Sequence, residues 1–206
     1  MSRSTAVPFD WSHEAPWPAV LEGANAIYVI VDESPHGVDR LGRFLDLSNA
    51  RGVQRIVLLS ARDWIDADRV DGLALEDLVR RSGMEWTILR PAWFAQNFDA
   101  PGYFADGIRR GRILHASGDG RCSFVDARDI AGVANAVLTE PGHHRREYAL
   151  SGPDAITMSD VAKRSGAPWG GRSKQSRWKC LSTKGISRVL ATIWRPSTPS
   201  PTSTVQ

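Results

Sequence analysis

Residues 86–98, WTILRPAWFAQNF, place aromatic and amide side chains directly after a short apolar run. Aromatic rings such as those of Trp93 and Phe94 can pack against a flat ligand, and the amides of Gln96 and Asn97 can donate and accept hydrogen bonds. A packed core would continue in Val, Ile and Leu instead. We therefore expect a strand that ends at a binding cleft, where Gln96 or Asn97 hydrogen-bonds a substrate carbonyl. Stabilisation of the loop explains the two amides equally well.

Candidate ligand-binding residues follow three other strand-like runs in the same way. In open α/β sheets, ligands bind beyond the carboxyl ends of the strands, at the point where the strand order reverses. The residues in this position are Asp10 and Trp11, Val31 and Asp32, Ser60 and Ala61, and Pro91 to Asn97. A turn or a helix cap explains each of them taken singly. Their occurrence at four successive strand ends indicates one shared site.

The sequence offers no phosphate cradle and no metal site. It contains neither a G-x-G-x-x-G sequence, whose glycines bring backbone N–H groups to a pyrophosphate, nor a Walker sequence. His143 and His144 lie in the loop PGHHRR, without a carboxylate or a third ligand at metal spacing. Cys122 and Cys180 are far apart and follow no metal or redox spacing.

The elements that must position these residues alternate between strands and helices. Four β-type runs are predicted at 26–31, 55–60, 86–91 and 146–152. The first three are nearly continuous in apolar residues, as parallel strands covered on both faces are. Helical stretches follow the first two, with Gly52 and Gly83 as stops, and Asp126 caps a helix over 126–140. The segment before them is interpreted as a short strand ending at Phe9-Asp10. This order predicts an α/β fold with a doubly wound parallel sheet.

Charge and composition divide the chain into two parts. Asp160 is the last acidic residue, so residues 1–160 carry all 23 acidic and 17 of the 26 basic side chains. We place a domain at 1–163 and a basic, Ser/Thr/Pro-rich tail at 164–206, largely disordered, in which only 186–194 favours a short helix. The tail's cations and tryptophans offer a nucleic-acid contact as a rival interpretation, but without a fold motif an incidental tail is favoured.

Membrane insertion and secretion are not predicted. The longest wholly apolar run is AIYVIV (26–31), far shorter than the roughly 20 residues that span a bilayer. The N-terminal stretch MSRSTAVPFDWSHE has no apolar signal core. We therefore expect a cytoplasmic protein that has a small-molecule partner.

Several stretches resemble one known family in order and spacing. They are FDWSHEAPWPAVLEGANAIYVIV, GVQRIVLLSAR, LEDLVRRSGMEWTILRPAWFAQNF and SFVDARDIAGVANAVLTEPGHHRREYALSGPDAITMSDVA. They are similar to the NmrA-like atypical short-chain dehydrogenases/reductases, near NAD(P)H-quinone oxidoreductases and festuclavine and agroclavine dehydrogenases. The resemblance covers residues 6–163. It implies a Rossmann-like fold, NADP or NAD as cofactor, and hydride transfer to a quinone or another small conjugated acceptor.

The resemblance also implies roles for individual residues. Pro91, Ala92, Trp93 and Phe94 would border the nicotinamide. The other implied cofactor contacts are Asp10 and Trp11 near the adenine, Val29 to Val31 near the adenosine ribose, and Ser60 near the nicotinamide ribose. No catalytic residue is assigned. Four residues after the tyrosines stand Asp32, Gly107 and Gly152, so the Tyr-x-x-x-Lys pair of classical members is absent.

Departures from the family pattern limit what the chain is expected to do. The family's first two strands and its glycine-rich loop are absent, so the predicted sheet is incomplete and cofactor binding should be weak or lost. The run at 26–31 would become an exposed apolar edge, which favours self-association. Besides an impaired oxidoreductase, two alternatives stay open: a non-catalytic NAD(P)-sensing regulator, and an inactive fragment of a longer reductase.

Overall fold

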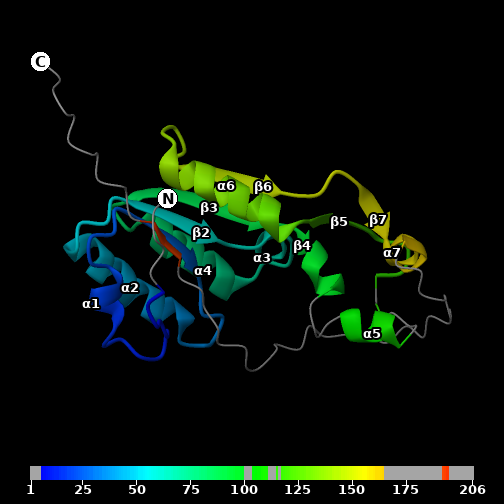
Figure 1. Ribbon diagram of the computed structural model, residues 1–206, viewed down its shortest axis with the longest axis horizontal. Coiled ribbons are helices and arrows are strands. Elements are labelled where there is room, and N and C mark those ends of the chain that lie inside the picture. Colours follow the sequence, from blue (N-terminus) through cyan, green and yellow to red (C-terminus); the bar gives the residue numbers. More distant parts are fainter. Residues whose placement is uncertain (1–5, 100–103, 111–114, 116, 165–191, 195–206) are drawn as a thin grey trace, which may run out of the picture.

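A five-stranded sheet with the order β6-β3-β2-β1-β8 lies at the centre of the molecule (Figure 1). The computed structural model describes residues 6–99, 104–110, 115, 117–164 and 192–194 of the chain. Four of the strands run parallel: β1 (Ala26–Ile30), β2 (Arg55–Leu59), β3 (Glu85–Pro91) and β6 (Arg146–Leu150). The short β8 (Thr192–Trp194) is antiparallel to β1. The four predicted strands are thus confirmed.

Helices cover both faces of this sheet (Figure 1). On one face lie α1 (Trp17–Val20), α2 (Gly37–Ala50) and α4 (Val70–Arg80), with α2 against α4. The opposite face is covered by α6 (Ala127–Thr139), which contacts β1, β2 and β3. The short α3 (Arg62–Asp66) precedes α4. Gly52 and Gly83 have φ of 78° and 79°, the left-handed conformation that ends a helix, as predicted.

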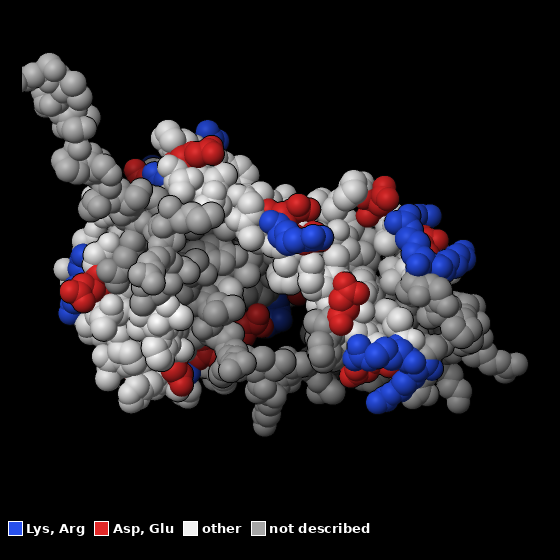
Figure 2. Space-filling model, in the orientation of Figure 1, with Lys and Arg blue, Asp and Glu red and all other residues white. Residues whose placement is uncertain are grey.

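A smaller sheet with the order β4-β5-β7 lies beyond the carboxyl end of β3, at the right of Figure 1. Its strands are β4 (Trp93–Phe94), β5 (Arg121–Val125) and β7 (Ala155–Thr157). Around it lie the 3₁₀ helix η1 (Ala95–Phe98), α5 (Ala105–Arg109) and α7 (Met158–Arg164). Figure 2 shows the surface hollowed between the part built on the main sheet and the part that carries α5 and α7.

The hydrophobic core has a half on each face of the main sheet because its strands are apolar throughout. Ile56 and Leu58 of β2 point into the half covered by α2 and α4, while Val57 points toward α6, and all three are fully buried. This arrangement explains why the strands show no alternation of polar and apolar residues. No helix in the described part of the chain is long and apolar enough to cross a membrane.

The predicted strand ending at Phe9-Asp10 is wrong. Asp10 forms only an isolated bridge with His13. Phe9 and Trp11 instead pack into an aromatic cluster with Trp17 and Phe44, in which the Phe9–Trp11 and Trp17–Phe44 ring centroids are 5.0 and 5.3 Å apart. Burial of these large rings outweighs the pairing of a short strand.

The edge of β1 is not exposed along its first three residues, contrary to expectation. Ala26 to Tyr28 pair with β8, in the register Ala26↔Trp194. The helix predicted over 186–194 is therefore wrong for its last three residues, because β1 offers unpaired backbone groups that a strand can satisfy. Residues 165–191 and 195–206 of the predicted tail lie outside the described residues. Self-association stays a prediction.

Candidate functional site at the carboxyl edge of the sheet

Three of the predicted site segments meet at one edge of the main sheet because β1, β2 and β3 are parallel. Asp32 follows β1, Ser60 follows β2, and Ala92 follows β3. Trp11 lies beside the same edge, since its indole N–H donates to the carbonyl oxygen of Ile30 at 3.1 Å. Asp10 faces solvent, and its carboxylate accepts hydrogen bonds from Ser12 at 2.7 Å.

Several of the predicted cofactor contacts have side chains turned into the core. Val29 and Val31 are 3% and 9% exposed and pack on the side of the sheet that α2 and α4 cover. Trp11 is 5% exposed, and Pro91 is buried. These residues present mainly backbone atoms at the edge, so their predicted roles depend on main-chain contacts.

Ser60 is held by a buried carboxylate. Its hydroxyl donates to Glu76 Oε1 at 2.6 Å, and Glu76 has no exposed surface. Arg90 donates to both carboxylate oxygens, at 2.8 and 2.6 Å, and Arg80 donates to Oε2 at 2.8 Å. Both arginines also pair with Glu147 of β6. The network joins β2, β3, β6 and α4 and fixes the end of β2.

The network also sets the ionisation of its central group. Burial raises the pKa of Glu76, but the hydrogen bonds from Arg90 and Ser60 and the charges of Arg90 and Arg80 outweigh it. The pKa of Glu76 therefore lies below its ordinary value, and the group is a carboxylate. Arg90 belongs to this network and not to an open surface.

An aromatic wall follows β3. The Ala92 N–H donates to the carbonyl oxygen of Leu150 at 2.7 Å, which fixes the chain where it leaves the sheet. Trp93 is 42% exposed, and its ring stacks on Phe104 of the segment before α5, at 5.9 Å and 30°. Phe98 also stacks on Phe104, with ring centroids 5.3 Å apart. Trp93 thus forms part of an aromatic surface with Phe104 and Phe98, and Phe94 beside it is half-buried.

Gln96 has a structural contact in the loop. Its amide donates to Asp126 Oδ1 at 3.0 Å, and its carbonyl oxygen accepts from the Ala127 N–H at 2.9 Å. Asp126 is the N-cap of α6 and accepts from the Arg128 N–H, and hydrogen bonds from Arg128 hold the pKa of Asp126 well below its usual range. Of the two interpretations of Gln96, loop stabilisation is the one observed. Asn97 is half-buried, and its substrate role stays a prediction.

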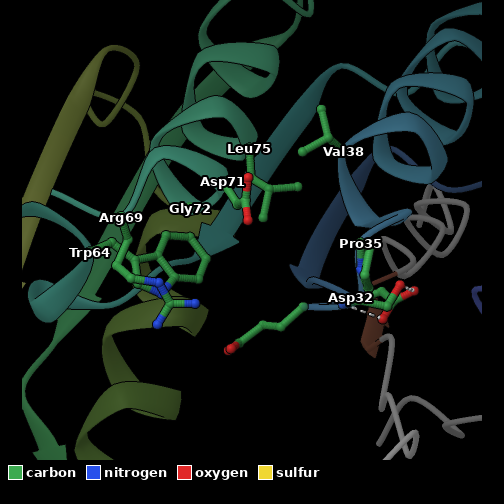
Figure 3. Close-up of a pocket in the computed structure, with 10 residues that line it drawn as sticks. Asp32, Pro35, Val38, Trp64, Arg69, Asp71, Gly72 and Leu75 are labelled. Carbon is green, nitrogen blue, oxygen red and sulfur yellow. Dashed lines mark hydrogen bonds between the residues drawn. The ribbon is translucent and has the colours of Figure 1, made fainter. Parts of the chain in front are cut away.

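A small pocket opens at the same edge, between the loop after β1 and the start of α4 (Figure 3). The residues that line it are Asp32, Glu33, Ser34, Pro35, Val38, Trp64, Arg69, Asp71, Gly72 and Leu75. Of these residues, only Asp32 is among the site residues predicted from the sequence. Trp64 lies in α3, Arg69 precedes α4 and Asp71 is in the first turn of α4, whereas the sequence predicts one helical stretch that begins after Trp64. The signal that points to them is their position just after the strand end at Ser60.

Asp32 fixes the wall of this pocket formed by the β1–α2 loop. Its carboxylate accepts from the backbone and hydroxyl of Ser34, at 2.9 and 2.7 Å, and pairs with Arg40. Burial raises the pKa of Asp32, but these hydrogen bonds and the Arg40 charge bring it below the ordinary value. The loop is tight: a Cβ on Gly37 would lie 1.8 Å from the Asp32 carbonyl oxygen, so only glycine fits there.

Comparison with known proteins identifies the family. Residues 2–141 match the profile of a family described as NAD(P)H-binding. The chain belongs to this NAD(P)H-binding family. Agroclavine dehydrogenase from Claviceps fusiformis is 39% identical over 163 residues, which is 75% of this chain and 56% of the relative. NAD(P)H azoreductase from Xenophilus azovorans is 33% identical over 150 residues, 70% of this chain and 51% of the relative. The chain therefore spans about half the length of these relatives.

Solved structures of NAD(P)H-dependent enzymes share the fold. An NADPH-dependent quinone oxidoreductase from Escherichia coli, complexed with NADPH, superposes with a TM-score of 0.66 at 24% identity, over 78% of this chain and 59% of that one. The triphenylmethane reductase of Citrobacter sp., complexed with NADP(H), gives 0.66 at 20% identity with the same coverage. The predicted Rossmann-like α/β fold and the predicted family are confirmed.

Proposed function

We propose that this chain supports NAD(P)H-dependent reduction of a quinone or another small conjugated acceptor, with the nicotinamide and the acceptor at the carboxyl edge of the main sheet. One observation carries the proposal: the ends of β1, β2 and β3, the aromatic wall at Trp93 and the pocket at Trp64 all lie at this edge. That edge is where α/β sheets bind ligands, and the family is NAD(P)H-binding.

The residues present fit one end of a dinucleotide. Pro91 and Ala92 are small, and half-exposed Trp93 offers a flat apolar face next to them, which suits a planar ring. The sequence contains no G-x-G-x-x-G turn to hold the pyrophosphate. We therefore expect weak binding of NADPH and NADH, with a dissociation constant above the micromolar range.

The reaction requires little of the protein other than the positioning of the nicotinamide and the acceptor. A bound reduced nicotinamide supplies a hydride. With a proton from solvent, that hydride reduces a quinone to a hydroquinone, and NAD(P)H becomes NAD(P)⁺. The chain has no Tyr-x-x-x-Lys pair to transfer the proton. Its residues would act by holding the two partners together, which lowers the entropic cost of their reaction. They would also exclude water.

A titration of the purified chain tests the proposal. NADPH and NADH are added separately, binding is followed by calorimetry, and turnover is followed as loss of reduced nicotinamide after menadione is added. Binding with menadione-dependent oxidation supports the proposed reductase. Binding without turnover favours an NAD(P)-sensing regulator, and no binding at millimolar cofactor favours an inactive fragment. A sub-micromolar dissociation constant would contradict the expectation of weak binding.

A further inference from the structure

Trp64, which lines the pocket of Figure 3, has a hydrogen-bond donor that the protein itself does not use. Trp64 is 4% exposed, yet its indole N–H makes no hydrogen bond in the described part of the chain. In that same part, no buried side-chain nitrogen or oxygen lacks a partner. The Trp64 N–H is therefore not fully buried, and Trp64 lines the pocket. The other two tryptophans of the core, Trp11 and Trp17, donate to carbonyl oxygens at 3.1 Å.

A glycine holds Trp64 in this position. A Cβ placed on Gly72 would lie 2.4 Å from Trp64 Cδ2, so the indole lies directly against the backbone of α4. Figure 3 shows Trp64, Gly72 and Arg69 on one side of the pocket, facing Asp32, Pro35 and Val38 on the other. The ring is fixed by packing, which makes its N–H a preorganised donor.

Other donors border the same space. α4 begins at Val70 without a side-chain cap, so the N–H groups of its first turn are not satisfied by a capping side chain. Arg69 forms no ion pair with the described residues. A ligand atom that accepts hydrogen bonds therefore suits this wall.

The charges of the pocket restrict the ligand further. Asp32, Glu33 and Asp71 place three carboxylates along it, of which Asp32 is paired with Arg40. Asp71 stands in the first turn of α4, where a negative charge stabilises the helix without any ligand. A carboxylate ligand would be repelled by Glu33 and Asp71, whereas a neutral carbonyl compound would not. The apolar side chains of Val38 and Leu75 suit a ring.

We propose that the Trp64 indole N–H donates a hydrogen bond to a carbonyl oxygen of a neutral, quinone-like acceptor bound in this pocket. This inference rests on the proposed function and adds a specificity-determining residue to it. The hydrogen bond would fix the position of that carbonyl oxygen in the pocket.

Nuclear magnetic resonance of the indole N–H groups tests the inference without cofactor. Each of the eight tryptophans gives one nitrogen–proton signal, and the spectrum of Trp64→Phe identifies that of Trp64. Addition of menadione should shift the Trp64 signal and leave those of Trp11 and Trp17 in place. Menadione that fails to bind, or that binds without moving the Trp64 signal, overturns the inference.

Matched variants measure the contribution of the donor. Trp64→Phe keeps a ring but removes the N–H, and it should weaken menadione binding roughly 3- to 10-fold, the range expected for one neutral hydrogen bond. Gly72→Ala should weaken binding as well, because it displaces the indole. Gly42→Ala, in α2 with no atom within 4 Å of the added carbon, should leave binding unchanged. Equal affinity of Trp64→Phe and the unaltered chain contradicts the inference.

The two proposals fail in different ways. A Trp64 signal that does not move, in a chain that still oxidises NADPH with menadione, overturns the role of Trp64 alone. A signal that moves, in a chain that never oxidises NADPH, overturns the proposed reductase activity and leaves acceptor binding in place.

Discussion

At the scale of single residues, the buried charges at the strand ends mainly stabilise the fold. Glu76 is fully buried and contacts Arg90, Arg80 and Ser60. A buried ion pair that loses one partner leaves an uncompensated charge, which costs far more than an exposed pair contributes. Ser60, which the family resemblance places near the nicotinamide ribose, donates its hydroxyl proton to Glu76.

Replacement of Arg90 tests how much this network contributes to the free energy of unfolding. Arg90→Met should lower the free energy of unfolding by about 3 kcal/mol, because Glu76 loses two of its four hydrogen bonds. Arg43→Met removes the exposed pair with Glu14 and should cost at most about 1 kcal/mol. Urea unfolding monitored by circular dichroism gives both values. Equal effects of the two substitutions would contradict the assigned role of Arg90.

The depressed pKa of Glu76 predicts loss of stability in acid. A carboxyl whose pKa is lower in the folded state stabilises the protein fully above its unfolded-state pKa, here 4.5. That contribution is lost as the pH falls from there through the folded-state pKa. Urea unfolding at a series of pH values should show a decline that begins near pH 4.5. In Arg90→Met the decline should be smaller, and an unchanged decline would assign it to other carboxyls.

At the scale of elements, hydrophobic patterning predicted the parallel strands and the helices α2, α4 and α6, because each buries a continuous or periodic apolar surface. It failed at Phe9, where aromatic packing overrides a strand pattern, and at β8, where three tail residues pair with β1. The pocket was missed for a similar reason. Trp64 reaches its place through α3 and through its contact with Gly72, two features that depend on tertiary packing.

The helical glycines give a test of that packing. Gly132→Ala in α6 has open space around the added carbon and should raise the free energy of unfolding by up to about 1 kcal/mol, through better helix propensity. Gly72→Ala gains the same propensity but must displace Trp64, so it should lower the free energy of unfolding. Thermal and urea unfolding of both variants measure the difference. A stabilised Gly72→Ala would show that Trp64 is not fixed against α4.

At the scale of the whole molecule, the main sheet depends on β8 for the cover of its outer edge. Without β8, β1 would be the last strand of the sheet, and its unpaired backbone groups would face solvent. Unpaired apolar edges favour association with other chains. The charged surface does not replace this cover: among the Lys and Arg side chains that gather over α5 and α7 in Figure 2, Arg109 pairs with Asp106 and Arg164 with Asp154.

Two deletions separate the role of β8 from that of the residues after it. Removal of residues 192–206 takes away β8 and should increase self-association, seen as a larger mass in sedimentation velocity. Removal of 195–206 alone keeps β8 and should leave the mass unchanged. Identical masses for both shortened chains would show that β8 does not protect the edge of β1.

The central claim is that the carboxyl edge brings a reduced nicotinamide and a conjugated acceptor together. The most direct test is the rate of NADPH oxidation by menadione at millimolar NADPH, with and without the purified chain. We predict a rate that rises in proportion to the amount of chain, with half-saturation by NADPH above the micromolar range. A rate equal to that of NADPH and menadione alone, in a chain shown to be folded, would contradict the claim.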